Sequence, residues 1–323
     1  MKTPVNSPPF PPLLAILFGI LAVSTAAIFI RSAQEYAPSL VIAAYRLSLA
    51  TLLLFPLALG FHRQELRSLG GKELALALLS GFFLALHFAT WITSLEYTTV
   101  ASSVVLVTTT PLWVALLNPF TIREPLTRLV LFGMALALVG GIIVGLSDSC
   151  SWQAGRLVCP SATDVVRGRA FLGDLLAVLG AILAAAYVLI GRRLRSGMSL
   201  VGYIFIVYGM AALVLIGLVL VAHQPLIGYP SQTYLWFFLL ALLPQLVGHT
   251  TFNWALRYLS AAFVSITLLG EPIGSTILAY IFLKETPTAL KIFGAILILA
   301  GIYVASRSES RQKPVVSESL SEY

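Results

Sequence analysis

Charged side chains are scarce in this sequence, and their scarcity excludes most soluble folds. Asp, Glu, Lys and Arg make up only 10% of the 323 residues, whereas soluble domains contain about 25%. Hydrophobic residues make up 59%, and the mean hydropathy is +0.94. A chain with so few polar groups cannot cover its own apolar surface, so we expect a membrane protein.

Several motifs and patterns are also missing. The net charge of +7 is scattered over short loops, without a basic run interleaved with aromatics, so no nucleic-acid partner is expected. There is no G-x-S-x-G, H-E-x-x-H or Walker-type loop, so we expect no enzymatic activity, catalytic residue, metal, cofactor or direct use of ATP. The first apolar stretch, residues 13–30, lacks an A-x-A cleavage site and is interpreted as a helix of the mature chain.

What is present is a series of apolar runs of about 18 to 25 residues, the length that crosses a hydrocarbon core of about 30 Å. Short strands of alternating polarity are not seen. The expected fold class is an all-α membrane protein with about ten transmembrane helices. We place the spans at residues 12–30, 38–60, 73–95, 98–120, 127–146, 171–190, 199–222, 233–256, 260–283 and 287–306.

The distribution of positive charge predicts the orientation. If the N-terminus is cytoplasmic, thirteen Lys and Arg residues fall in inside segments and six in outside segments, and Arg46 falls within a span. An excess of positive charge marks the cytoplasmic side. We therefore expect both termini in the cytoplasm of a multi-pass protein of the cell membrane, which is the inner membrane in a Gram-negative cell.

The sequence has only two cysteines, and both lie in the longest polar break. Cys150 and Cys159 are outside in this topology, where oxidising surroundings and a short separation favour a disulfide. Two free thiols are the alternative. In either case their expected role is structural rather than chemical.

The two halves of the chain are related by a shift of 161 residues. This shift aligns residues 96–145 with 257–306 without a gap, and identical residues recur along the alignment. Among the identical pairs are Tyr97/Tyr258, Ala101/Ala262, Pro111/Pro272, Leu117/Leu278, Glu124/Glu285, Thr127/Thr288, Phe132/Phe293, Gly133/Gly294, Leu136/Leu297, Leu138/Leu299 and Gly140/Gly301. The shift also pairs Gly19 with Gly180 and Arg31 with Arg192. Because each half has five spans, an odd number, the halves must be inverted, as in many secondary carriers.

A motif of the form P…(R/K)E…T…G occurs once in each half. Its residues are Pro111, Arg123, Glu124, Thr127 and Gly133, then Glu271 with Pro272, Lys284, Glu285, Thr288 and Gly294. Together with Arg46 and the pair Gly173 and Asp174, this pattern resembles the drug/metabolite transporter superfamily, specifically its EamA-type ten-helix members. The resemblance covers nearly the whole chain. It implies export or exchange of small metabolites, amino acids or drugs.

The resulting domain organisation has four parts. A first EamA-type repeat covers residues 1–146, an external loop 147–170, a second repeat 171–306, and a disordered cytoplasmic tail 307–323. The expected function is secondary transport by alternating access, with a small-molecule substrate and the lipid bilayer as partners. A homodimer and a monomer are both left open. An intramembrane enzyme or a receptor without transport is the alternative.

Two ionisable residues fall inside predicted spans, where a charge usually faces a cavity or a partner. Arg46 lies about eight residues, or roughly 12 Å, from the outer end of its span. Glu271 lies near the middle of the ninth span. The functional interpretation is a central cavity that both residues line. The alternatives are a permanent structural ion pair, or Arg46 extending outward to the interface.

Other polar and helix-breaking residues complete the candidate site. His87 and Trp91 share one helix face, and Gln245, His249 and Asn253 form a stripe at α-helical spacing. Either set lines a cavity or makes hydrogen bonds between helices. Tyr187, Tyr203 and Tyr208 are weaker candidates.

Pro111 and Pro272 occupy equivalent positions in the two halves and are predicted hinges, although proline also occurs in passive helices. Gly141 and Gly145 are expected to permit close helix packing.

Overall fold

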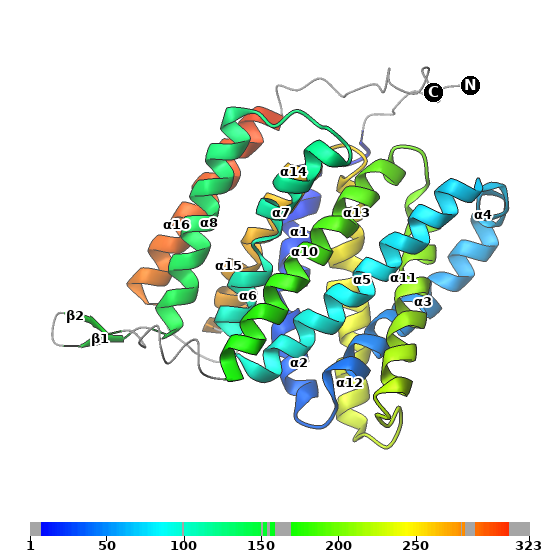
Figure 1. The fold of residues 1–323 in the computed structure, drawn as a ribbon, viewed down its shortest axis with the longest axis horizontal. Coiled ribbons are helices and arrows are strands. Elements are labelled where there is room, and N and C mark those ends of the chain that lie inside the picture. The colour runs from blue at the N-terminus through cyan, green and yellow to red at the C-terminus, as the bar shows by residue number, and fades with distance from the viewer. Residues whose placement is uncertain are drawn as a thin grey trace.

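The computed structural model describes residues 8–98, 100–149, 151–153, 156–158, 169–278, 280–281 and 288–309. Within these ranges the chain is almost entirely helical. The helices pack side by side in one bundle, and α5 and α10 cross its middle (Figure 1).

The first half of the chain contains five helical segments. The first is bent at Thr25 into α1 and α2, and the fourth is broken into α6, α7 and a short 3-10 turn. The helices are α1 (Pro12–Ser24), α2 (Ala26–Gln34), α3 (Ser39–Phe61), the short α4 (Arg63–Ser68), α5 (Gly71–Tyr97), α6 (Val100–Val107), α7 (Thr110–Leu117) and α8 (Arg128–Ser149).

The second half repeats this order. Its helices are α10 (Arg169–Arg195), α11 (Leu200–Val221), α12 (Ser231–Leu240), α13 (Thr250–Ala255), α14 (Ala261–Thr267), α15 (Glu271–Leu278) and α16 (Ala289–Glu309). A π-helix (Ala241–His249) joins α12 to α13, and a 3-10 turn (Leu268–Gly270) joins α14 to α15.

The helix boundaries of the two halves agree with the shift of 161 residues found in the sequence. Adding 161 to the bounds of α7 gives the bounds of α15, and the starts of α3 and α8 map onto the starts of α11 and α16. The first segment runs from the upper to the lower face of the bundle in Figure 1, whereas α10 runs in the opposite direction. This arrangement confirms the predicted inverted repeat.

Contacts between side chains follow the same symmetry. Arg31 donates a hydrogen bond to the carbonyl of Leu95 at 3.0 Å, and its counterpart Arg192 donates to the carbonyl of Leu256 at 2.7 Å. The residues of the second bond are those of the first shifted by 161 positions. The two halves therefore share tertiary contacts as well as helix order.

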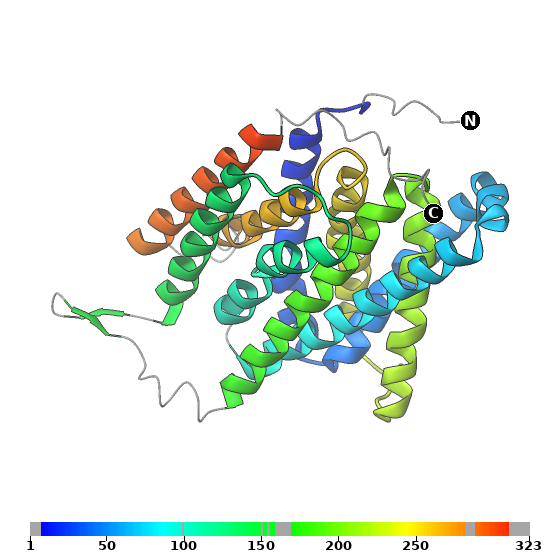
Figure 2. The ribbon, with the colours of Figure 1, turned by 45° about the horizontal axis from the view of Figure 1, so that its top comes forward.

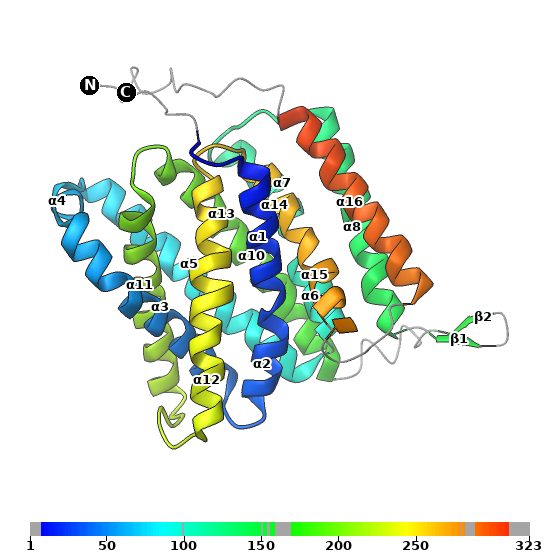
Figure 3. The ribbon, with the colours of Figure 1, turned by 180° about the vertical axis from the view of Figure 1, so that it is seen from behind.

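Helix length and hydropathy support seven of the ten predicted membrane spans. Within the described residues, seven helical segments are long and apolar enough to cross a membrane, and they coincide with predicted spans one to four and six to eight. The other three predicted spans coincide with α8, α14–α15 and α16, which carry shorter apolar stretches. The start of α1 and the end of α16 lie on the same face of the bundle, as Figure 3 shows from behind.

Helices α8 and α16, the last of each half, make the most extensive contact between described helices and lie together in all three ribbon views (Figures 1, 2 and 3). A Cβ atom placed on Gly133 would lie 2.6 Å from the carbonyl oxygen of Gly301, and one on Gly140 would lie 2.6 Å from that of Gly294. These four glycines are the two glycine pairs of the aligned region, Gly133/Gly294 and Gly140/Gly301. The backbones of the two helices come so close at these positions that neither helix has room for a side chain, which explains why both carry glycine.

The prediction that Gly141 and Gly145 mediate close packing was wrong for Gly141. A Cβ at Gly141 would meet only Leu269 Cδ2, at an ordinary 3.7 Å, whereas the surroundings of Gly145 lie outside what the structure describes. Gly141 lies on a different face of α8 from Gly133 and Gly140, which meet α16. The glycines that meet in this contact are seven residues apart in each helix, Gly133 and Gly140 in α8 and Gly294 and Gly301 in α16.

The segment between the halves contains a small hairpin that extends away from the bundle (Figure 2). Its strands are β1 (Ser151–Gln153) and β2 (Arg156–Val158), with Ser151 opposite Val158. Cys150 and Cys159 lie outside the described residues, so their disulfide stays a prediction. At the other end of the chain, α16 continues to Glu309, three residues into the predicted tail.

We expect Gly140→Ala to destabilise the protein, because the new methyl group would overlap the backbone of α16. Overpacking of this kind costs about 1–3 kcal/mol. Gly141→Ala is the matched control, since its methyl group has room and a helical Gly→Ala change is neutral or stabilising by up to about 1 kcal/mol. Thermal unfolding of both variants in detergent tests this, and equal midpoints would contradict the close approach.

Candidate functional site

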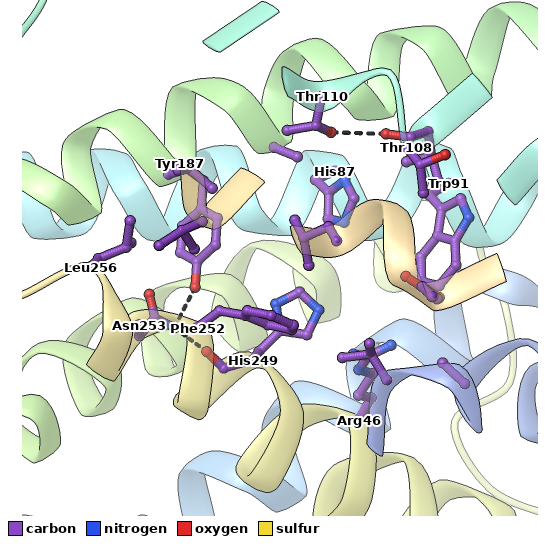
Figure 4. A pocket seen from close by; sticks show the side chains of 18 residues that line it. Arg46, His87, Trp91, Thr108, Thr110, Tyr187, His249, Phe252, Asn253 and Leu256 are labelled. Atoms are coloured by element: carbon purple, nitrogen blue, oxygen red, sulfur yellow. Dashed lines mark hydrogen bonds between the residues drawn. The ribbon is translucent and has the colours of Figure 1, made fainter. Parts of the chain in front are cut away.

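A cavity of about 60 Å³ lies inside the bundle, between the two halves of the chain. Both halves contribute to its wall, through α1, α2, α3, α5, α6 and α7 from the first and α10, the π-helix, α13, α14 and α15 from the second. Its wall is mostly apolar, but it contains a guanidinium, a carboxylate and two imidazoles. Figure 4 shows Arg46, His87, Trp91 and His249 directed toward one another from three different segments.

The structure places six of the seven predicted site residues on the wall of this one cavity. They are Arg46, His87, Trp91, His249, Asn253 and Glu271. Gln245 does not line the cavity. It is fully buried, and its side-chain oxygen accepts a hydrogen bond from Arg46 Nε at 2.9 Å.

Arg46 is held rigidly although it lies deep in the bundle. Its side chain is 0% exposed, which excludes the alternative that it extends to the interface. The guanidinium carbon lies 4.2 Å from the ring centre of Phe88, a cation–π contact. Because Gln245 and Phe88 fix the guanidinium plane, the two terminal nitrogens keep a defined direction.

Glu271 is not joined to Arg46 by an ion pair. The two ion pairs between described residues are His62 with Glu65 and Arg192 with Glu124. Glu271 is 8% exposed and lies on the same cavity as Arg46. The alternative of a permanent direct pair therefore does not describe this conformation, in which the two charges face a shared space.

His87 and Trp91 form a flat aromatic side of the cavity. Their rings stack with centres 5.9 Å apart and an angle of 10° between the planes. His87 Nδ1 donates to the carbonyl of Gly180 at 2.9 Å, which fixes the ring against α10. This one histidine both lines the cavity and bonds between helices, so its two predicted roles are combined.

The polar stripe of the eighth span differs from the expected α-helical geometry. The segment Ala241–His249, which contains Pro244, forms a π-helix, whose backbone hydrogen bonds span five residues instead of the four of an α-helix. His249 and Asn253 face the cavity, while the amide oxygen of Gln245 is taken by Arg46. Asn253 in turn donates to Tyr187 Oη at 2.5 Å and to the carbonyl of His249 at 2.8 Å.

Both predicted hinge prolines lie directly after a break in their helix. Pro111 is the second residue of α7, after a break at Thr108 and Thr109, and Pro272 is the second residue of α15, after a 3-10 turn. Thr110 and Glu271, the residues before the prolines, both line the cavity. The helix breaks thus adjoin the cavity in both halves.

The wall of the cavity is built from residues that the repeat relates to one another. Adding 161 to Val23, Ala26, Trp91, Val107 and Thr110 gives further lining residues, namely Ala184, Tyr187, Phe252, Leu268 and Glu271. The cavity therefore lies on the pseudo-twofold axis between the halves. Thr110 had no functional prediction and Tyr187 only a weak one, although their pairing with Glu271 and Ala26 was available from the sequence.

A second hollow, of about 230 Å³, lies near the upper ends of α1, α11 and α13. It is lined by Phe10, Ala15, Leu200, Thr250, Thr251 and Trp254, none of which is charged. Because it has no ionisable group and lies away from the axis, we assign the candidate site to the central cavity.

Comparison with known proteins decides the family. A model of the EamA-like transporter family matches residues 11–146 and again residues 171–307, together most of the chain. The chain belongs to the EamA-like transporter family. It is therefore a multi-pass membrane transporter, in agreement with the resemblance seen in the sequence.

Two further comparisons agree with this assignment. An uncharacterized transporter of Archaeoglobus fulgidus is 24% identical to this EamA-like transporter over 286 residues, which cover 87% of this chain and 92% of the relative. A protein of known crystal structure shares the fold with a TM-score of 0.70 at 18% identity, covering 93% of this chain and 98% of that one. At this identity the second likeness concerns the fold alone.

In this EamA-like transporter the repeated motif orders loops and helix ends. Asn118 bonds to both the N–H and the carbonyl of Glu124, and Arg123 adopts a left-handed backbone with φ 54°. This turn directs Glu124 to Arg192 Nε at 2.5 Å and to the N–H of Ala261 at 3.1 Å. The Thr127 hydroxyl accepts from the N–H of Val130 at the start of α8. Glu124 thus connects the loop before α8 to α10 and α14, while Glu285 lies outside the described residues.

We expect Glu124→Gln to lower the stability of the folded state, because the amide cannot form the charged pair with Arg192. Hydrogen bonds to charged groups are worth about 1.5–3 kcal/mol, and both side chains here are only 18% exposed. The midpoint of thermal unfolding in detergent measures the effect. Glu35→Gln, at an exposed position, is the control, and equal losses in the two variants would show that Glu124 has no special role.

Proposed function

We propose that this protein is a secondary transporter that exports or exchanges small metabolites, amino acids or drug-like compounds by alternating access. The observation that carries this proposal is the single central cavity, which lies on the axis between two inverted halves and contains a buried guanidinium and carboxylate. Intramembrane charges of this kind mark substrate or ion pathways in transporters. The substrate-binding residues are then Arg46, His87, Trp91, Gln245, His249, Asn253 and Glu271, with Gln245 acting through Arg46.

The inverted symmetry supports the mechanism. Two inverted halves can exchange their conformations, which opens a fixed midplane site first to one side and then to the other. Pro111 and Pro272 are the proposed hinges, because the helix breaks before them adjoin the cavity in both halves. On the face that holds the start of α1, Glu124 connects the two halves, so this contact is expected to open and close with that side.

In the proposed topology the protein spans the cell membrane, with both termini in the cytoplasm and the hairpin outside. The repeats are assigned to residues 1–146 and 171–306, with the external loop at 147–170 and the tail at 307–323. Its support is the excess of Lys and Arg on the proposed inside, together with the common face of the two ends of the helical bundle.

Reporter fusions test this topology. Fusions after residues 66, 125, 194 and 310 should report a cytoplasmic location, and fusions within residues 150–165 should report an external one. The physical reason is that positively charged short loops are retained on the cytoplasmic side. A C-terminal fusion that scores as external would contradict the model.

Replacement of Glu271 tests the site. In Glu271→Gln the shape is kept and the charge is removed, so transport in liposomes should be abolished or changed in specificity while the folded yield stays near that of the parent protein. Full transport by Glu271→Gln would remove Glu271 from the site.

Arg46→Ala and the double variant Arg46→Ala/Glu271→Ala separate a transport site from a structural pair. Breaking a buried ion pair costs about 3–5 kcal/mol because one charge is left uncompensated. If the charges stabilised each other, Arg46→Ala would fold poorly and the double variant would recover yield. The transport proposal instead predicts loss of flux in both variants without such recovery.

A further inference from the structure

Five buried polar atoms on the cavity wall have no hydrogen-bond partner among the described residues. They are Arg46 Nη1 and Nη2, Trp91 Nε1, Asn253 Oδ1 and Glu271 Oε1. Buried polar groups in proteins are nearly always paired, so unpaired ones that converge on a cavity indicate the chemistry of what binds there. Three of these atoms are donors and two are acceptors.

The donors fit one anionic group. Arg46 uses its Nε on Gln245 and its face on Phe88, which leaves the two terminal nitrogens as a fixed fork. Such a fork matches the two oxygens of a carboxylate.

The acceptors fit a cationic group. Glu271 makes no ion pair with Arg46 or with another described residue, although it is more than nine-tenths buried. The Asn253 amide nitrogen is used by Tyr187 and His249, which leaves its oxygen as a second acceptor. A protonated amine supplies several donors at once and neutralises the carboxylate.

The repeat shows that these polar groups are not duplicated. At the positions related by 161 residues, Arg46 corresponds to Val207, Asn253 to Ile92 and Glu271 to Thr110. One half of the symmetric cavity therefore supplies the guanidinium and the other half the carboxylate. A ligand with two different charged ends would bind in one orientation.

The size and lining of the cavity limit the ligand further. Its volume of about 60 Å³ is small beside the roughly 300–1,000 Å³ of sites for drug-sized molecules. Most of the remaining wall is apolar, with Val264, Leu268 and Phe252 among its residues, although His87, His249 and three hydroxyl side chains also line it. A compact ligand with an apolar body fits these conditions.

We propose that the cavity recognises a small zwitterion, with its carboxylate at Arg46, its protonated amine at Glu271 and Asn253, and an apolar body against the remaining wall. This inference rests on the proposed function, because it names the substrate class of the same site. The proposed substrate class is narrower than the range of substrates implied by the family, because it disfavours drug-sized compounds and solutes with a single charge.

The experiment uses the purified full-length protein in detergent and three apolar amino acids, each compared with two analogues that lack one charge. The probes are L-valine with isobutylamine and isovalerate, L-leucine with isoamylamine and 4-methylvalerate, and L-phenylalanine with phenethylamine and 3-phenylpropionate. Thermal protection is titrated for each probe. We expect at least one amino acid to protect at concentrations about 10- to 100-fold below those of its analogues, the ratio that one charged hydrogen bond provides.

Variants assign each charge to its residue. Arg46→Met should bind the amine as well as the amino acid, and Glu271→Gln should bind the acid as well as the amino acid. Glu35→Gln, at an exposed position, should keep the full preference. If a variant does not fold, the titration of the parent protein with the matched probes still decides between one charge and two.

The outcomes separate this inference from the transport proposal. If none of the three amino acids protects the protein, or if a singly charged analogue protects it equally well, the proposal that the cavity recognises a zwitterion is wrong. Transport of a singly charged solute in liposomes alongside that result would leave the transport proposal intact. A zwitterion that binds but does not cross the liposome membrane would support the recognition and contradict transport.

Discussion

The burial of one guanidinium inside the helix bundle constrains much of the structure around it. Arg46 has no exposed surface and forms no ion pair with a carboxylate of the described residues, so its charge is stabilised by the Gln245 amide, the Phe88 ring and the polar groups of the cavity wall. A charge at this depth costs several kcal/mol unless it faces such groups. The π-helix that carries Gln245 and the aromatic stack of His87 and Trp91 surround this one side chain.

Symmetry and its local loss have different functions in this EamA-like transporter. The structural contacts are symmetric: the bonds of Arg31 and Arg192 recur within each half, and the glycines of α8 and α16 meet between the halves. The groups that give the cavity its charge are asymmetric, because Val207 and Thr110 stand where the other half has Arg46 and Glu271. In the proposed alternating-access mechanism the duplicated frame would support two equivalent conformations, while the unequal residues Arg46/Val207 and Glu271/Thr110 give the cavity two distinct ends.

The repeated P…(R/K)E…T…G motif is structural in the described part of the chain. Pro111 follows a helix break, Glu124 connects its loop to α10 and α14, Thr127 caps α8, and Gly133 allows α16 to approach. None of the last three lines the cavity. The residues that carry the family resemblance are therefore largely separate from those that would select a substrate, in keeping with the wide range of solutes that the resemblance implies.

Composition by itself determined the membrane class, and the 161-residue shift determined the inverted repeat. The sequence also indicated most of the residues that meet in the cavity, because a charged side chain within a membrane span is stable only in the interior that the two halves share. Tertiary structure alone decided three other points. Gln245 lies in a π-helix and bonds to Arg46 instead of lining the cavity, and neither the π-helix around Pro244 nor this bond can be read from α-helical spacing. Gly133 and Gly140, and not Gly141, lie at the contact of α8 with α16, because the position of the neighbouring helix decides which face of α8 is packed. The separation of Arg46 from Glu271 likewise required coordinates, since two residues 225 positions apart can share a depth without touching.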